Sequence, residues 1–153
     1  TKAQNTELLE AYASWNNLNY AIVYFYNVYG DGEVTTGKYS TVIGKFINLM
    51  KAGNTTLPIT SPGTQERNFT HIDDTVAGLI LVMEWGSGDG WGIGNNTAYS
   101  LLDLAEMCGA IPSMQPEKAG NRMAGVVHNE MLTALGWKPQ VNLQEYINEK
   151  LDI

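Results

Sequence analysis

The feature that most constrains the fold is the segment 20–28 (YAIVYFYNV), an almost unbroken run of apolar, aromatic and β-branched residues. Side chains alternate between the two faces of a strand, so a run without polar alternation predicts a strand buried on both faces. Such strands are typical of a parallel sheet covered by helices. Gly30 and Gly32, on either side of Asp31, then predict a turn that ends the strand.

Helical patterns alternate with shorter extended segments around this strand. Leu8, Leu9, Tyr12 and Trp15 share one helical face, so the chain begins inside a helical pattern. We therefore expect the sequence to start within a longer protein. Further helices are predicted over 41–50, 72–85, 101–108, 130–135 and 143–151. Short strands are predicted over 57–60, 67–71, 91–93 and 126–127, with 86–90 as a turn and 112–120 irregular. This order predicts an α/β fold: the last part of a parallel layer, continued by a small α+β lobe.

Three polar pairs with the spacing of helix caps support the helix starts. Thr70 with Asp73 and Ser100 with Asp103 have the capping-box spacing, and Asn142 with Glu145 three residues later precedes the last helix. After the first of these, the apolar residues repeat at i, i+4, i+7 and i+8, which predicts an amphipathic helix. These apolar residues are Ile72, Val76, Leu79, Ile80 and Met83.

Composition excludes several classes of function. The 153 residues include 9 basic and 16 acidic ones, a net charge of −7, which argues against a nucleic-acid scaffold or a polybasic membrane surface. Cys108 is the single cysteine and there are two histidines, so no zinc pattern can be written and no metal is expected. No apolar run approaches the ~20 residues that span a bilayer, and no leader pattern opens the chain. We therefore expect a cytoplasmic protein.

The glycine-rich segment 86–94 (GSGDGWGIG) does not carry a dinucleotide-binding fingerprint. No frame in it gives G-x-G-x-x-G, a helix precedes it where a strand is needed, and no Walker A motif occurs elsewhere. Without a glycine-rich phosphate-binding loop, a bound phosphate must be held by a few individual side chains. Arg67 is the only arginine before Arg122, and its guanidinium could clamp a phosphate. An ordinary ion pair with Glu66 or Asp73 is an equally good reading.

Two other polar groups invite interpretation. Asn27 interrupts the apolar strand near its end, where a buried amide needs partners and where parallel sheets bind their ligands. His71, Asp73 and Asp74 could form a catalytic or metal cluster. Their place at a predicted helix N-terminus favours structural capping, because carboxylates stabilise the exposed N–H groups there.

Several motifs, in order, resemble those of extended short-chain dehydrogenases/reductases, the NAD-dependent nucleotide-sugar epimerases and dehydratases such as UDP-glucose 4-epimerase. Residues 24–30 (YFYNVYG) resemble the family's R-Y-F-N-V-Y-G, and 65–74 (QERNFTHIDD) are similar to Q-R-R-D-F-T-H-V-D-D. Residues 37–43 look like the helix entry that follows the first motif, 93–100 like N-I-G-x-G…Y-S, and 135–139 like L-G-W-x-P. The resemblance covers almost the whole chain and implies the C-terminal half of such an enzyme.

The resemblance implies a fold and a reaction. Residues 1–36 would be the last helix and strand of a Rossmann-type layer, and 37–153 the substrate-binding lobe. NAD would accept and return a hydride at a sugar carbon, with a tyrosine as general acid/base. The complete enzyme would bind a nucleotide-sugar and form a homodimer through the helix containing Leu8, Leu9 and Tyr12.

The resemblance also implies roles for particular residues. Thr1 and Lys2 fall on the end of the family's Y-x-x-x-K, so Lys2 would be the catalytic lysine that also bonds the nicotinamide ribose, with its tyrosine partner before Thr1. Tyr26 would contact the cofactor. Substrate would be bound by a set that includes a second phosphate-binding cation. That set comprises Asn27, Tyr39, Ser40, Val42, Arg67, Lys118 and Arg122.

Departures from the family pattern leave part of this reading open. Tyr24 replaces an arginine, Glu66 stands where a first arginine is common, and 118–121 only loosely match R-P-G-D. The glycine-rich half and the catalytic tyrosine lie outside these residues, so we expect this chain alone to be inactive and to bind NAD weakly. The alternative functions are a non-enzymatic nucleotide-sugar binding or interaction module and an inactive fragment. The nucleotide-sugar, and the choice between epimerase and dehydratase, stay open.

Overall fold

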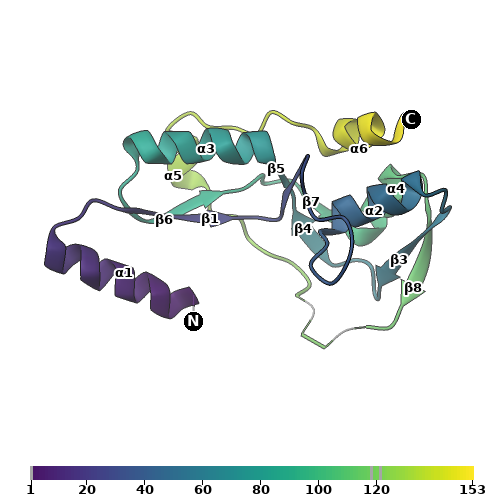
Figure 1. Cartoon of the computed structure of the whole chain (residues 1–153), viewed down its shortest axis with the longest axis horizontal. Helices are drawn as coiled ribbons and strands as arrows, with labels where there is room; N and C mark the ends of the chain where they lie inside the picture. The colour runs from purple at the N-terminus through teal and green to yellow at the C-terminus, as the bar shows by residue number, and fades with distance from the viewer. Residues whose placement is uncertain (1, 118, 121) are drawn as a thin grey trace.

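The computed structural model describes residues 2–117, 119–120 and 122–153, and confirms the predicted α/β class (Figure 1). The helices are α1 (Lys2–Asn16), α2 (Val42–Lys51), α3 (Ile72–Trp85), α4 (Leu101–Met107), α5 (Glu130–Ala134) and α6 (Leu143–Leu151). The strands are β1 (Ala21–Phe25), β2 (Val28–Tyr29), β3 (Thr56–Thr60), β4 (Glu66–Asn68), β5 (Thr70–His71), β6 (Gly88–Ile93), β7 (Ala98–Ser100) and β8 (Ile111–Gln115). Every predicted helix is present, with ends within a few residues of those expected. None of the described helices is both long and apolar enough to cross a membrane.

The central strand pairs as its sequence predicts but is less buried. β1 pairs in parallel with β6, and α3 packs on this pair (Figure 1). Tyr24 and Phe25 are 41% and 53% exposed, so the expectation that this strand is buried on both faces is wrong. The reason is that, among the described residues, α3 is the main helix packed on β1 and β6 the only strand beside it, so the other face and the other edge are largely uncovered. The strand also ends at Phe25, before the predicted residue 28, because Asn27 has a φ of 39° and turns the chain out of extended geometry.

Three further strand pairs complete the sheet structure. β2 pairs with β5 and β3 with β8 in parallel, whereas β4 and β7 are antiparallel. β8 corrects the expectation of an irregular segment over 112–120, and the strand β6 begins at Gly88, within the segment expected to be a turn. Residues 126–127, expected as a strand, are not in one. The pairing partners of β6 and β8 are far away in sequence, and local propensity does not reveal them.

Two hydrophobic clusters make up the core. The larger lies among α2, β3, α4 and α6, with Leu57, Ile59 and Leu104 almost fully enclosed. The smaller gathers Val82, Trp91, Ile93, Leu132 and Trp137, with Ala21 and Val23 of β1 packed against it. The smaller cluster therefore contains residues from both sides of the predicted boundary at residue 36. The division into 1–36 and 37–153 stays a prediction.

The predicted N-caps are present at α4 and α6 but not at α3. Ser100 and Asp103 form the predicted capping box at α4, and the Asn142 side chain caps α6. At α3 the predicted box is wrong: His71 is the N-cap, and its Nδ1 accepts a hydrogen bond of 3.2 Å from Asp73 N. The Thr70 hydroxyl does not cap the helix, because it accepts a hydrogen bond from the backbone N–H of Asn95.

The apolar stripe of α3 faces outward instead of into the core. Val76, Leu79, Ile80 and Met83 are 41–75% exposed, whereas Asp74, Thr75, Gly78 and Val82 are the buried residues of this helix. The predicted helix is therefore present, but its buried face is narrower and more polar than the periodicity indicates. Part of its apolar surface has no neighbour among the described residues.

Candidate functional site

Three of the predicted substrate residues line one cavity. Asn27 lies at the kink between β1 and β2, Val42 begins α2, and Arg67 is in the middle of β4. Segments that are far apart in sequence thus meet where β1 ends, at the carboxyl end of a parallel strand. The cavity has a volume of about 390 Å³ and is completed by Thr60, Gln65, Phe69 and Leu101.

Asn27 is exposed, so the expectation of a buried amide at this position is wrong. Its Nδ2 donates a 3.0 Å hydrogen bond to Asn68 O, and its carbonyl oxygen accepts from Thr70 N at 3.4 Å. These bonds hold the kink against the strand pair β2–β5. The amide oxygen of Asn27 accepts no bond from the described residues, which leaves an acceptor at the mouth of the cavity.

Arg67 is half-buried in β4, where it lies opposite Tyr99 of β7. Its Nη1 donates a 2.7 Å hydrogen bond to the carbonyl oxygen of Glu66. The guanidinium carries five donors in a planar fork, a geometry that suits a phosphate or carboxylate, and Arg67 lines the cavity.

The remaining predicted site residues are dispersed. Tyr39 is 82% exposed and Ser40 donates from Oγ to Gly37 O at 2.9 Å, both in the loop before α2. Arg122 is exposed and donates from Nε to Ala124 O at 2.7 Å. Lys118 lies outside the described residues.

The two predicted cofactor residues lie on separate segments, Lys2 in α1 and Tyr26 directly after β1. Lys2 is exposed at the start of α1, the helix on the opposite side of the β1–β6 pair from α3 (Figure 1). The Tyr26 ring packs against Gly94, and its hydroxyl accepts a 3.3 Å hydrogen bond from His128 N. Neither side chain lines the cavity that Asn27 and Arg67 share. Their proposed roles stay predictions.

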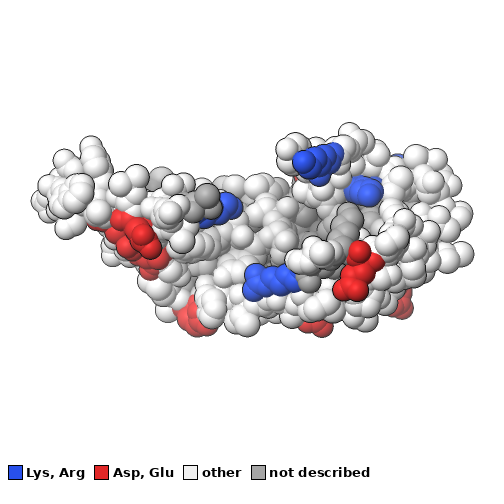
Figure 2. All heavy atoms as spheres, turned by 90° about the horizontal axis from the view of Figure 1, so that it is seen from below, with Lys and Arg blue, Asp and Glu red and all other residues white. Residues whose placement is uncertain are grey.

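Charge is unevenly distributed over the surface. Figure 2 shows separate Lys and Arg side chains across the middle of one face, with Asp or Glu side chains at centre right, at the left end and along the lower edge. No group of three His, Cys, Asp or Glu residues in the described ranges is placed to hold a metal ion.

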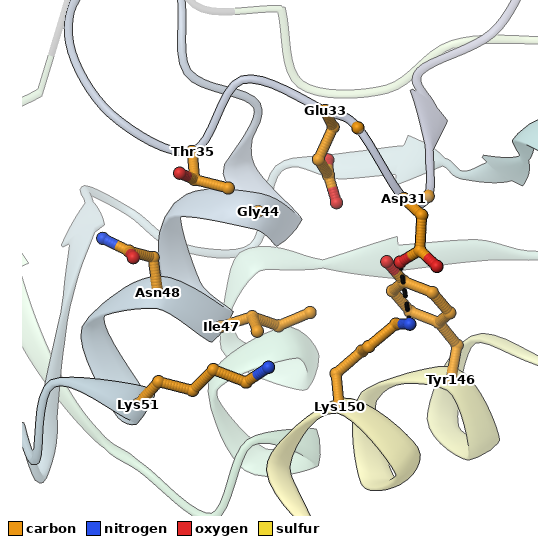
Figure 3. A pocket seen from close by; sticks show the side chains of 11 residues that line it. Asp31, Glu33, Thr35, Gly44, Ile47, Asn48, Lys51, Tyr146 and Lys150 are labelled. Carbon is orange, nitrogen blue, oxygen red and sulfur yellow. Dashed lines mark ion pairs between the residues drawn. The ribbon is translucent and has the colours of Figure 1, made fainter.

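A second cavity, which the sequence did not indicate, lies between α2, α6 and the turn after β2 (Figure 3). It has a volume of about 250 Å³, and Asp31 pairs with Lys150 across it at 2.7 Å. Hydrogen bonding from Lys150 lowers the pKa of the Asp31 carboxyl, and the same bond raises the pKa of Lys150. Burial, with the nearby Glu33 and Asp31 carboxylates, raises the pKa of Tyr146 to about 12. The ion pair thus closes one end of a cavity that has both charge signs on its walls.

Behind this ion pair lies a buried aromatic cluster. The rings of Tyr29, His71 and Tyr146 contact one another edge to face, with centroids 5.1–5.2 Å apart. Burial, reinforced by the Asp74 carboxylate, raises the pKa of Tyr29 above its usual range. His71 therefore serves as a cap and a packing element, in agreement with the structural reading of this histidine.

Asp74 has a role that sequence reasoning missed. Its buried carboxylate accepts hydrogen bonds from Gln140 N at 2.9 Å and Val141 N at 3.1 Å, and its carbonyl oxygen accepts from the indole of Trp137. The carboxylate thus fastens the segment before α6 to the first turn of α3.

Gln65 was also missed as a cavity residue. Its position two residues before Arg67, on the same side of an extended chain, was the available signal.

Comparison with known proteins gives one family. A model of the NAD dependent epimerase/dehydratase family matches residues 1–94. The dTDP-L-rhamnose 4-epimerase of Burkholderia thailandensis is 29% identical over 158 residues, which cover 97% of this chain and 43% of that protein. The dTDP-D-glucose 4,6-dehydratase of Mus musculus is 31% identical over 140 residues, covering 82% and 38%. The chain spans less than half the length of these curated relatives.

Solved structures agree with the sequence comparison. UDP-glucose 4-epimerase from Thermotoga maritima, determined with UDP-glucose, superposes with a TM-score of 0.88 at 25% identity, covering 99% of this chain and 50% of that one. UDP-glucose 4-epimerase from Thermus thermophilus, in complex with NAD, gives a TM-score of 0.78 at 24% identity, covering 95% and 50%. The fold is thus part of a Rossmann-type epimerase fold, as the sequence resemblance implied.

Proposed function

This chain belongs to the NAD dependent epimerase/dehydratase family, and from that membership we propose that it is the C-terminal, substrate-binding half of an enzyme that epimerises or dehydrates a nucleotide-sugar. The relatives are enzymes, and their names include epimerases, dehydratases and decarboxylases. The chain matches less than half of each of these relatives, so the catalytic activity is proposed for a complete enzyme.

The observation that carries this proposal is the meeting of Asn27 and Arg67 in one cavity. A guanidinium can donate two parallel hydrogen bonds to a phosphate, and its charge is permanent. In this role Arg67 holds the diphosphate, and the free amide oxygen of Asn27 accepts from a hydroxyl or N–H group of the same ligand. Val42 and the loop with Tyr39 and Ser40 then lie along the nucleotide.

NAD supplies the hydride chemistry in this family, but the described residues do not by themselves form its site. No G-x-G-x-x-G sequence is present, and Lys2 is exposed and lines neither the cavity of Asn27 and Arg67 nor the cavity closed by Asp31 and Lys150. We therefore expect this chain alone to bind NAD weakly and to be inactive. Lys2 and Tyr26 remain the residues proposed to approach the cofactor in a complete enzyme.

The same observation supports the alternative function, a nucleotide-sugar binding or interaction module without redox chemistry, or an inactive fragment. The two readings share the cavity and differ in whether a cofactor-binding half accompanies it. Adding NAD together with a nucleotide-sugar separates them in a preparation of the longer natural protein. Transient reduction of bound NAD, followed by absorbance at 340 nm after rapid mixing, supports the enzyme, because the hydride returns to the sugar in each turnover.

Calorimetric titration of the chain with UDP-, dTDP- and GDP-sugars tests the shared part of the proposal. Arg67→Ala should weaken the binding of the preferred nucleotide-sugar by about 1.5–3 kcal/mol, roughly 10- to 150-fold, because a hydrogen bond to a charged group is lost. Lys51→Ala removes the same charge outside this cavity and should change the affinity less than about twofold. Absence of heat with every nucleotide-sugar, or equal losses in the two variants, contradicts the proposal.

A further inference from the structure

Gln65 carries a polar atom without a partner. Its side chain is almost completely buried, with 2% of the residue exposed. The amide nitrogen donates a 2.8 Å hydrogen bond to Thr60 O, but the amide oxygen receives no hydrogen bond. A buried acceptor left unpaired is unfavourable, because folding removes its water and supplies nothing in exchange. Such an atom calls for a physical explanation.

The position of Gln65 connects this unpaired oxygen to the cavity. Gln65 and Arg67 lie two residues apart on an extended chain, and both line the cavity that contains Asn27. Phe69, Leu101 and Val42 supply apolar walls to the same space. A ligand that fits this lining has an anion for the guanidinium and a flat, largely apolar part that also donates a hydrogen bond.

We propose that Gln65 is a specificity-determining residue of this cavity, whose amide oxygen accepts a hydrogen bond from the ring N–H of a nucleobase. The inference rests on the proposed function, since it requires Arg67 to hold the diphosphate of the same nucleotide. A sugar presents hydroxyl groups on all sides and matches apolar walls poorly, whereas a base has apolar faces and a polar edge. Uracil, thymine and guanine have a ring N–H, and neutral cytosine has none.

The oxygen is closed to bulk solvent, so the base reaches it through a turn of the terminal amide. The last torsion of a glutamine side chain is broad, so a small turn that keeps Nε2 within reach of Thr60 O needs no change in the backbone. Gln65 then keeps its bond to Thr60 O, and its oxygen gains the hydrogen bond that it lacks in the free chain. A ligand without the donor leaves the oxygen unpaired in the bound state, and this difference produces selectivity.

Calorimetric titration of the full chain with UDP, CDP and N3-methyl-UDP tests the inference. We expect UDP to bind about tenfold more tightly than CDP or N3-methyl-UDP, the ratio that loss of one neutral hydrogen bond gives. Gln65→Met keeps the length of the side chain without the amide, and should reduce UDP to the affinity of CDP while changing CDP less than about twofold. Arg67→Ala should weaken UDP and CDP by the same factor.

The outcomes distinguish this inference from the proposed function. If UDP binds and Arg67→Ala weakens it, but N3-methyl-UDP binds as well as UDP, the role of Gln65 is wrong and the proposed function stands. Equal losses for UDP and CDP in Gln65→Met lead to the same conclusion. If the unaltered chain binds no nucleotide, both fail. The N3-methyl-UDP comparison uses the unaltered chain and so does not depend on the folding of a variant.

Discussion

The ammonium nitrogen of Lys150 lies 2.7 Å from Oδ1 of Asp31 and joins the last helix to the turn after β2. The Lys150 side chain is largely enclosed, and its nitrogen also lies 5.2 Å from the centre of the Tyr146 ring. The Asp31 side chain is mostly exposed, so solvent screens the pair. The pair therefore acts as a positioning contact between two elements and adds little to overall stability.

Asp31→Asn should make stability less dependent on pH at the acid end. The pKa of Asp31 is lowered in the folded chain from its ordinary value of 3.8, so the pair stabilises above that value and is lost as pH falls through the lower folded value. The variant should be slightly less stable than the unaltered chain at neutral pH and equal to it in strong acid. Urea unfolding midpoints across this range at low salt measure the difference. Glu117→Gln, at an exposed acid, serves as the control, and a difference independent of pH contradicts the prediction.

Asp74→Ala should destabilise the chain by about 3 kcal/mol, because the N–H groups of Gln140 and Val141 lose a charged acceptor. The neighbouring Asp73 is 80% exposed, so Asp73→Ala should cost roughly 0.3–1 kcal/mol through the loss of a carboxylate at the helix N-terminus. Chemical denaturation gives both values. Hydrogen exchange should also show faster exchange at Gln140 and Val141 in Asp74→Ala only. Equal effects of the two substitutions would show that the carboxylate does not fasten this segment.

Gly92→Ala should destabilise by about 1–3 kcal/mol or more, because a Cβ at this position would overlap the carbonyl oxygen of His128. That oxygen belongs to the backbone and cannot move as a side chain can. Gly125→Ala is the matched control: its Cβ would meet only the end of the exposed Arg122 side chain, 3.0 Å away. It should be neutral or slightly stabilising. Thermal unfolding of both variants checks the contrast, and a tolerated Gly92→Ala would mean that residues 126–129 do not lie against β6.

Asn27 allows backbone strain to be separated from hydrogen bonding. With φ at 39°, Asn27→Ala loses the bond to Asn68 O and adds left-handed strain, so we expect a loss of roughly 2 kcal/mol. Asn27→Gly loses the same bond but tolerates this φ, and should lose about half as much. Unfolding free energies measure both. If the alanine variant is as stable as the glycine variant, the kink at residue 27 is not strained.

Leu8, Leu9, Tyr12 and Trp15 form an apolar stripe on α1 that is 41–79% exposed, and we propose that it contacts a second copy of the chain. Leu8→Lys should therefore shift the protein toward the monomer in sedimentation equilibrium. Ser14→Lys adds the same charge to another exposed face of the helix and should leave the mass unchanged. A monomeric unaltered chain at high concentration contradicts the proposal.

The helices could be predicted because their signals are local. The Ser100–Asp103 box and the Asn142 cap lie beside the residues that they cap, and apolar periodicity gives the length of α3. Periodicity does not say which neighbour a helix face meets, so it could not reveal that the apolar stripe of α3 is exposed in the described chain. Pro112 and Ser113 are poor strand formers, so β8 depends on its pairing with β3. No local sequence signal predicts this strand.

The candidate site could be predicted only in part for the same reason. Asn27 and Arg67 were identifiable by residue type and motif, and the cavity that unites them depends on how β2 and β5 pair. The partners of Asp74 lie at residues 140 and 141, beyond the reach of any local pattern. The unpaired oxygen of Gln65 is visible only once the side chains around it are placed.

The strand pairing also constrains how the chain acquires its structure. Each pair of described strands joins distant segments, and even the nearest pair, β4 with β7, brings Glu66 to Ser100. The described strands form no hairpin that could nucleate early, so the helices form first and the strands pair only after long loops have closed. During synthesis on the ribosome β3 cannot find its partner until residues 111–115 have emerged. Until then its hydrogen-bonding edge is open to other nascent chains.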